Sequence, residues 1–468
     1  MTQDLASYAL LVGAAKAVQF MMLPVLTHLF SAKDFGAVEL IVMATGLLSI
    51  VMSLSMESAV ARMWFEASEQ QQTAELLGTA LMSVTLFGAL LACGFWAVTR
   101  SWEIASLGAG AADLLSPIVA ATALASALLA VTQVALRMER RVAAFGTLQI
   151  TQAALGGALP VALIVGWQMG VFGYALGTLG ATLVTLALGL YLIRSQLARH
   201  ASLTRLKACL RYAVPLTPAV LITWANGQFD RVILLTLAGM GVLGIYGAAA
   251  RLAAVIALAV EVFRLAWMPL AMRQLDAQTT RALFFRRSLT GYAVVMCTLG
   301  LLIVAVCREL MTLLTTDEYL SGYVAVPWLV GAQILYGSAS ITNAGMLATR
   351  KTAGNSKAAA VGAVVNVTLG VCLVWAFGLQ GSAVGSMTAA LIFTVLLMRL
   401  SMQELRLPFD RPAALGCLVI FAASSTAMLA LQASWPETSL PARLGVLAVA
   451  LAATLVLGWR RWPNGGSA

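Results

Sequence analysis

Long apolar stretches separated by short polar connectors run along the whole chain. A stretch of about 18 or more apolar residues is long enough to cross the hydrocarbon core of a bilayer as a helix. The pattern therefore predicts an all-α polytopic membrane protein. We expect fourteen transmembrane helices, over residues 8–30, 38–63, 77–99, 115–137, 142–166, 171–193, 212–238, 242–268, 288–306, 321–348, 357–377, 381–400, 413–432 and 441–459.

Composition supports this class. Of 468 residues, 61% are hydrophobic and only 10% are charged, with a mean hydropathy of +0.91, whereas soluble domains carry roughly 25% charged residues. No Lys or Arg precedes the first apolar stretch, and this stretch is longer than a signal peptide requires, so we interpret it as a retained span. The six cysteines are scattered and form no pair or cluster with histidines, so neither a disulfide framework nor a metal site is expected.

Basic residues indicate the orientation. With the fourteen spans alternating across the membrane and the N-terminus inside, 21 Lys and Arg residues fall on the inner side and 4 on the outer side. Cytoplasmic connectors retain Lys and Arg, so both termini are predicted to be cytoplasmic. The net charge of +10 is thereby explained by topology, and no nucleic-acid partner is expected.

A glycine-rich phrase occurs twice, 208 residues apart. Gly170-x-x-Gly173-x-Ala175-x-Gly177 lies between the fifth and sixth spans, and the same spacing starts at Gly378 between the eleventh and twelfth. Six spans separate the copies, which predicts two six-helix lobes with the same orientation, an arrangement found in secondary transporters. We expect an N-lobe over residues 1–193, a cytoplasmic connector over 194–211, a C-lobe over 212–400 and two further helices within 401–468.

Charged residues inside predicted spans are the candidates for function, because a charge at mid-depth costs about 2.5–3.5 kcal/mol. Lys16 and Arg251 are both predicted near mid-depth, one in each lobe. For Lys16 two interpretations stay open: a contact with substrate, or a structural role in which the lysine snorkels toward the cytoplasmic headgroups or is neutralised by Glu57. The outer half of the seventh span is also polar, which favours a wet lining; its candidates are Asn226, Gln228, Asp230 and Arg231.

Three further charged residues are expected at the cytoplasmic mouth. Glu261 and Arg264 share a helix face at i,i+3, which favours a local ion pair. Arg62 is expected to take part in a similar mouth contact or to anchor its helix among lipid headgroups.

Several motifs together resemble polysaccharide exporters of the Wzx type, members of the multidrug/oligosaccharidyl-lipid/polysaccharide (MOP) exporter superfamily. The resemblance covers the whole chain, and the order and spacing of its motifs are specific: Leu23-Pro24-Val25-Leu26-Thr27, Asp34-Phe35-Gly36, Ser58-Ala59-Val60-Ala61-Arg62, Tyr212-x-x-Pro215-Leu216-x-Pro218, Asp230-Arg231, Gly244-Ile245-Tyr246 and Trp267-x-Pro269.

This resemblance implies a flippase that moves a polyprenyl-diphosphate-linked oligosaccharide, such as an O-antigen, capsule or exopolysaccharide unit, from the cytoplasmic to the periplasmic leaflet of the bacterial inner membrane. It implies two lobes that alternate around a cationic cavity. Lys16 and Arg251, with Arg231, are then the candidates for binding the diphosphate, since cations attract it strongly in a poorly solvated cavity. Membrane lipids and other polysaccharide-assembly proteins are the expected partners.

Alternatives remain. A lipid II or multidrug exporter of the same superfamily is one, and a membrane-embedded glycan polymerase or ligase is another. The second would need a large outer loop with catalytic side chains, whereas the predicted outer connectors are short. No enzymatic activity and no cofactor are expected. Because no Walker A loop occurs, ATP is not expected to be the direct energy source. A proton or sodium gradient, the membrane potential and downstream consumption of the glycan stay open as energy sources.

Overall fold

The computed structural model describes residues 13, 17–18, 20–66, 70–101, 111–197, 202–275, 281–349, 353–405, 407–435 and 439–461. Within these ranges the chain forms helices and no strand, and twelve helices are long and apolar enough to cross a membrane. One of them, α15 (Ala353–Glu404), consists of two helices that meet at Gly378. Counting both gives thirteen such helices among the described residues, and the shorter apolar helix Phe20–Leu29 lies within the first predicted span. The predicted all-α membrane fold is confirmed.

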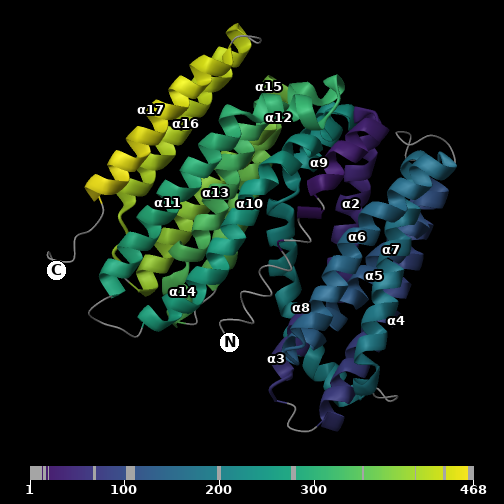
Figure 1. Ribbon diagram of the computed structural model, residues 1–468. Coiled ribbons are helices and arrows are strands. Elements are labelled where there is room, and N and C mark those ends of the chain that lie inside the picture. Colours follow the sequence, from purple (N-terminus) through teal and green to yellow (C-terminus); the bar gives the residue numbers. More distant parts are fainter. Residues whose placement is uncertain are drawn as a thin grey trace. The chain divides into compact units, whose positions relative to one another are not determined.

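Contacts divide the chain into two units, Met1–Ala225 and Asn226–Ala468. In the first unit the long helices lie side by side, and α7 packs along both α5 and α6 (Figure 1). Its elements are α2 (Ala32–Ser53), α3 (Met56–Met63), α4 (Gln70–Ser101), α5 (Ala111–Met138), α6 (Val142–Trp167), α7 (Gly170–Ile193), the 3₁₀ turn η1 (Arg194–Gln196) and α8 (Leu203–Asn226).

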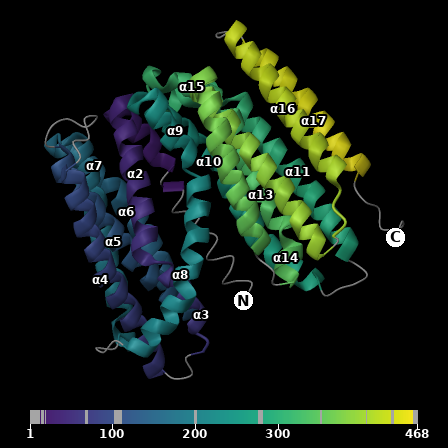
Figure 2. The same ribbon diagram turned by 180° about the vertical axis from the view of Figure 1, so that it is seen from behind.

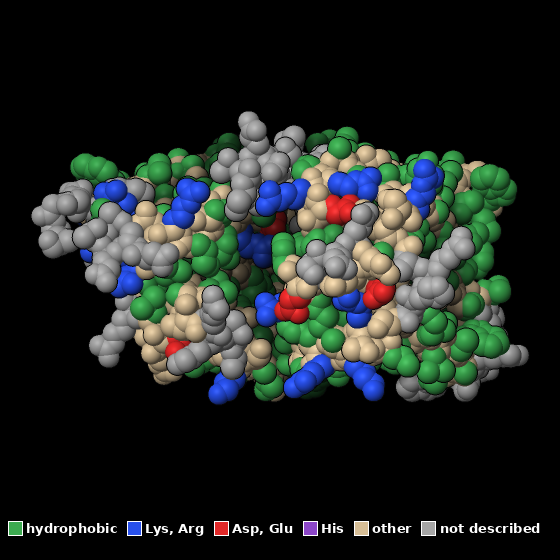
Figure 3. All heavy atoms as spheres, turned by 90° about the horizontal axis from the view of Figure 1, so that it is seen from below, with side chains coloured by type: hydrophobic (Ala, Val, Ile, Leu, Met, Phe, Trp, Pro, Cys, Tyr) green, Lys and Arg blue, Asp and Glu red, His purple; other side chains and the backbone are tan. Residues whose placement is uncertain are grey.

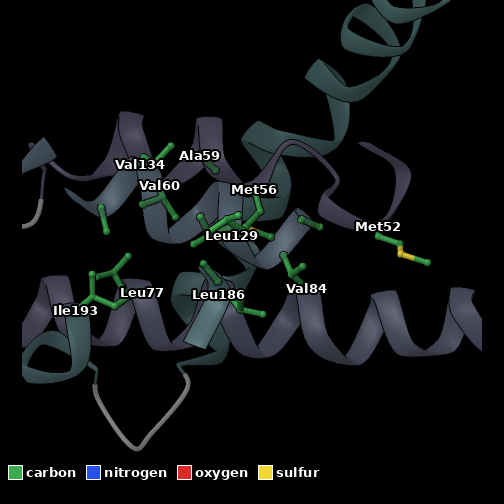
Figure 4. Packing of buried hydrophobic residues seen from close by; sticks show 14 of the residues in the cluster. Met52, Met56, Ala59, Val60, Leu77, Val84, Leu129, Val134, Leu186 and Ile193 are labelled. Atoms are coloured by element: carbon green, nitrogen blue, oxygen red, sulfur yellow. The ribbon is translucent and has the colours of Figure 1, made fainter. Parts of the chain in front are cut away.

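The core of the first unit is a cluster of buried apolar side chains to which each helix from α2 to α8 contributes; Figure 4 shows part of it. Met56 of α3, Leu77 and Val84 of α4, Leu129 of α5 and Leu186 of α7 are all buried in it. Lipid tails are as apolar as these side chains, so close van der Waals packing, rather than removal from water, stabilises such a core in a membrane.

The second predicted span is broken. Residues 38–63 were expected to form one helix, but α2 ends at Ser53 and α3 begins at Met56. Leu54 and Ser55 between them have φ values of 47° and 58°, a left-handed conformation that costs roughly 1–2 kcal/mol for each non-glycine residue. The Ser55 hydroxyl lies 3.3 Å from the Thr217 hydroxyl of α8, so a contact within the unit supports the break.

The seventh span is divided as well, but not at its prolines. Pro215 and Pro218 lie inside α8, which continues to Asn226 before the chain begins a new helix at Phe229. An ion pair connects the start of α8 to α4, with Arg205 Nε 3.1 Å from Glu75 Oε2. Contacts therefore group α8 with the first unit. The duplication into lobes of six helices stays a prediction.

The second unit carries the remaining helices, with α13 packed against both α10 and α15 and the last two helices against α11 (Figure 2). Its elements are α9 (Phe229–Ala238), α10 (Met240–Leu275), α11 (Arg281–Ala305), α12 (Cys307–Leu314), η2 (Asp317–Ala325), α13 (Val326–Thr342), α14 (Ala344–Thr349), α15, α16 (Arg411–Ser434) and α17 (Ser439–Arg461). Figure 3 shows one end of the helices, where Lys and Arg side chains stand among hydrophobic ones.

Candidate functional site

The break between α8 and α9 is held by two asparagine amides. Asn366 of α15 donates its Nδ2–H to the backbone oxygen of Asn226, at 3.3 Å, and Asn226 donates its own Nδ2–H to Ala359 O, at 2.9 Å. The side-chain oxygens of Asn226 and Asn366 are buried and have no hydrogen-bond partner among the described residues. Both are therefore available as acceptors beside an interrupted helix.

Asp230, in the first turn of α9, is buried at 8% exposure and is surrounded by donors from two other helices. Tyr246 of α10 donates its hydroxyl to Oδ2 at 2.5 Å, and Ser386 of α15 donates to the same oxygen at 3.2 Å. Ser382 donates to the backbone oxygen of Asp230 at 3.2 Å, and the Arg231 N–H donates to Oδ1 at 2.8 Å. We call Asp230, Tyr246, Ser382 and Ser386 the Asp230 cluster.

The Asp230 cluster can hold a positive charge. A buried carboxylate strongly favours a nearby cation, because its attraction is larger in a poorly solvated interior than in water. Oxygen atoms beside broken helices are the groups that coordinate coupling ions in secondary transporters. No group of three or more His, Cys, Asp or Glu side chains able to hold a metal ion occurs in the described part of the chain. Any cation here would therefore rely on Asp230 together with neutral oxygens.

The predicted cations are placed as follows. Arg231 is half-buried, and its Nη1 donates to Gln228 Oε1 at 2.7 Å, so Gln228 orients the guanidinium. Arg251 is half-buried within α10, about 16 Å along the helix axis from Met240. Lys16 lies outside the described residues, so its pairing with Arg251 or Glu57 stays a prediction.

In the first unit, Glu57 and Arg62 lie on α3, just after the break in the second span. Glu57 Oε2 is buried and has no hydrogen-bond partner among the described residues. Arg62 Nη2 lies 3.7 Å from Glu66 Oε1, with both side chains well exposed. An exposed pair of this kind contributes little to stability.

Near the end of α10, Arg264 Nη2 lies 2.6 Å from Glu261 Oε1, at the i,i+3 spacing. About half of the Arg264 side chain remains exposed. The pair is local to one helix, and its geometry alone assigns it no transport role.

Sequence reasoning missed the partners of Asp230. Tyr246 lies inside the Gly244-Ile245-Tyr246 motif. Ser382 lies within the second glycine-rich phrase, and Ser386, at i,i+4 from it, follows the phrase directly. The i,i+4 spacing of two polar residues on an apolar helix was an available signal. Nothing in the sequence alone pairs that face of α15 with α9.

Comparisons with known proteins place the fold. The sequence profile of a family described as "Polysaccharide biosynthesis protein" matches residues 1–274. No curated protein matches the chain.

Three solved structures illustrate the fold. The chain is similar to the lipid II flippase MurJ in an inward closed conformation, with 13% identity and a TM-score of 0.71 over 97% of this chain and 98% of that one. It is similar to a multidrug resistance MATE family transporter of the MOP superfamily in an inward-facing conformation, with 16% identity and a TM-score of 0.66 over 83% and 94%. A MOP superfamily transporter from Pyrococcus furiosus has 14% identity and a TM-score of 0.58 over 86% and 95%.

Proposed function

Because this chain belongs to the polysaccharide biosynthesis protein family, we propose that it is an alternating-access flippase for a polyprenyl-diphosphate-linked oligosaccharide. The proposed direction is from the cytoplasmic to the periplasmic leaflet of a bacterial inner membrane, with both termini in the cytoplasm. The fold shared with a flippase and with transporters supports transport rather than enzymatic catalysis.

The proposal of a diphosphate-linked substrate rests mainly on the position of Arg251. It is half-buried about 16 Å into the long helix α10. A guanidinium at such a depth is expensive unless it faces a wet cavity or a charged group, and its planar fork of donors matches the oxygens of a diphosphate. In this proposal Arg251 binds the diphosphate together with Lys16, and Arg231 supports it.

We further propose that the Asp230 cluster couples transport to a cation, either a proton or sodium. Asp230 lies at the start of α9, directly after an interrupted helix, and its donors come from α10 and α15. A change in the charge on Asp230 would alter its hydrogen bonds to both helices at once. The cluster thus offers a physical link between ion occupancy and the packing of three helices.

Reconstitution tests the proposed substrate. The full chain is inserted into liposomes that contain a fluorescent polyprenyl-diphosphate oligosaccharide, and a membrane-impermeant quencher reports movement between leaflets. We expect protein-dependent movement of this lipid. Parallel liposomes carry labelled lipid II or a cationic dye, because the fold is similar to a lipid II flippase and to a multidrug transporter. Movement of the dye alone would overturn the proposal, and movement of lipid II alone would assign the second candidate.

A further inference from the structure

The second unit contains a cavity of about 520 Å³ between α10 and α11. Its lining comes from one face of each helix and, among the ten residues that form it, includes no Asp or Glu: Phe263, Trp267, Gln274, Leu283, Phe284, Arg287, Ser288, Gly291, Tyr292 and Val295. None of the predicted transport residues belongs to this set. We call it the α10–α11 cavity.

One wall of the α10–α11 cavity is aromatic. The rings of Phe263 and Trp267 are stacked with centroids 6.3 Å apart, and Trp267 stacks on Phe284 at the same distance. Tyr292 lies with its ring 4.9 Å from that of Phe263, while its hydroxyl donates to Ile334 O. Rings arranged in this way form an extended apolar surface suited to a hydrocarbon chain.

Three polar side chains interrupt the apolar lining of the cavity. Gln274 is the last residue but one of α10, and Arg287 and Ser288 lie in the second turn of α11, about 9–10 Å from its start. Val295 lies about 21 Å from that start. Along α11, Arg287 and Ser288 therefore lie between Phe284, about 4–5 Å from the helix start, and Tyr292, about 16–17 Å from it, so the cationic part of the lining is bordered by aromatic rings on both sides.

A buried donor in this cavity has no protein partner. Trp267 is only 5% exposed, and its Nε1–H makes no hydrogen bond within the described part of the chain. Buried donors are normally satisfied. An acceptor oxygen on a molecule in the cavity would satisfy this one.

The cavity also opens onto an apolar surface. Val295, which lines it, is half exposed, and Leu299 one turn further along α11 is exposed as well. On a membrane-spanning helix such side chains meet lipid. A molecule of the bilayer can therefore reach the cavity from the side of α11 that carries Val295 and Leu299.

We propose that the α10–α11 cavity binds an anionic phospholipid of the surrounding leaflet. An acyl chain lies along the rings of Phe263, Trp267 and Phe284, and the phosphate lies near Arg287 and Ser288. The guanidinium and hydroxyl supply charge-assisted hydrogen bonds to phosphate oxygens. The apolar opening at Val295 favours a bilayer lipid over a soluble anion.

Native mass spectrometry of the full chain tests this proposal. The protein in detergent is mixed with equal amounts of phosphatidylglycerol and phosphatidylcholine that have the same acyl chains. We expect the wild type to retain phosphatidylglycerol preferentially. Arg287→Gln is expected to reduce this preference by about fivefold, the size typical of one basic residue near a lipid phosphate. Trp267→Phe keeps a ring but removes the N–H, and should reduce total phospholipid retention.

Arg286→Gln is the matched control, because Arg286 is the neighbouring residue, is exposed and does not line the cavity. Its lipid preference should equal that of the wild type. Equal retention of both phospholipids by the wild type would overturn the proposal, as would equal losses in Arg286→Gln and Arg287→Gln. Preferential retention of added undecaprenyl phosphate over phosphatidylglycerol would also overturn it. Flipping is measured separately, so failure here leaves the proposed transport function untouched.

Discussion

Gly170 and Gly378 both have a positive φ, 53° and 55°, at positions 208 residues apart. Gly170 starts α7 after α6, and Gly378 joins the two arms of α15. Glycine reaches such a φ readily, whereas a residue with a side chain would be strained at either position. The two glycine-rich phrases thus share an unusual backbone feature as well as their spacing, which supports the predicted parallel repeat.

The repeat predicts that the two turns face the same side of the membrane. Trp167 and Trp375 are exposed, each three residues before its glycine. We expect Trp167→Cys and Trp375→Cys to react with a membrane-impermeant maleimide from the same side, the periplasmic one. Labelling is measured in intact cells and after permeabilisation.

The two cysteines are introduced into a parent protein whose exposed native cysteines have been removed. Cys93 and Cys372 are exposed and are replaced by serine, whereas the other four cysteines are buried. The background alone should remain unlabelled. Reaction of the two introduced cysteines from opposite sides would contradict the parallel repeat.

The Asp230 cluster predicts a defect in coupling. Asp230→Asn removes the charge while keeping most of the shape, and we expect flipping to fall at least about tenfold because the cation site is lost. Tyr246→Phe removes the hydroxyl bonded to Asp230 Oδ2. It should lower stability by about 1–2 kcal/mol and change the dependence of flipping on pH or sodium.

The control for this pair is Tyr212→Phe, because Tyr212 is an exposed tyrosine of α8. It should flip lipid at the wild-type rate with unchanged ion dependence. Wild-type ion dependence in an active Asp230→Asn variant would show that this carboxylate does not couple transport.

A buried arginine connects α17 to the C-terminal end of α11 and to α12. Arg443, 1% exposed, donates Nη1 to Ala305 O at 2.7 Å and to Glu309 Oε2 at 3.0 Å, and its Nη2 donates to Glu309 Oε1. Burial alone would raise the pKa of Glu309, but the hydrogen bonds and positive charge of Arg443 outweigh it and hold this pKa below its ordinary value of 4.5.

The lowered pKa of Glu309 determines how the stability of the protein changes with pH. A carboxyl whose pKa is lowered on folding contributes stability above its unfolded pKa, and this contribution is lost as the pH falls through the lowered value. We expect the melting temperature of the wild type to decline below about pH 4.5. Glu309→Gln should lower stability at pH 7 by about 1–3 kcal/mol and flatten this decline.

Glu66→Gln is the comparison for this titration, because Glu66 belongs to an exposed ion pair. Thermal unfolding is followed in detergent from pH 7 to pH 3. An identical decline in the wild type and in Glu309→Gln would show that the pair with Arg443 does not contribute.

The length of the apolar stretches was enough to predict most of the spans. A helix needs about 20 apolar residues to cross a bilayer, and few other structures need an apolar stretch of that length. The interruptions were harder. In the seventh span the helix continues through Pro215 and Pro218, since proline in a membrane helix can be accommodated without ending it, and is interrupted only after Asn226. The break at Leu54 and Ser55 contains neither glycine nor proline, and it is supported by the contact between the hydroxyls of Ser55 and Thr217, which no local sequence pattern predicts.

The candidate site was partly predictable for the same reason. Asp230 stands out as a charge within an apolar stretch. Tyr246 and Ser386 do not, because their importance depends on α10 and α15 meeting α9, which no local pattern specifies. The α10–α11 cavity likewise exists only once two helix faces are brought together.

The proposed binding of the diphosphate by Arg251 and Lys16 is tested by the rate at which a polyprenyl-diphosphate oligosaccharide is flipped in liposomes that contain the Arg251→Ala or the Lys16→Ala variant. We predict that both variants insert normally and lose at least about tenfold in rate, because a cation for the diphosphate is missing. Arg251→Lys, which keeps the charge, should retain more activity than Arg251→Ala. Arg211→Ala, at an exposed position of α8, should behave as the wild type. Wild-type rates in both Arg251→Ala and Lys16→Ala would contradict the account.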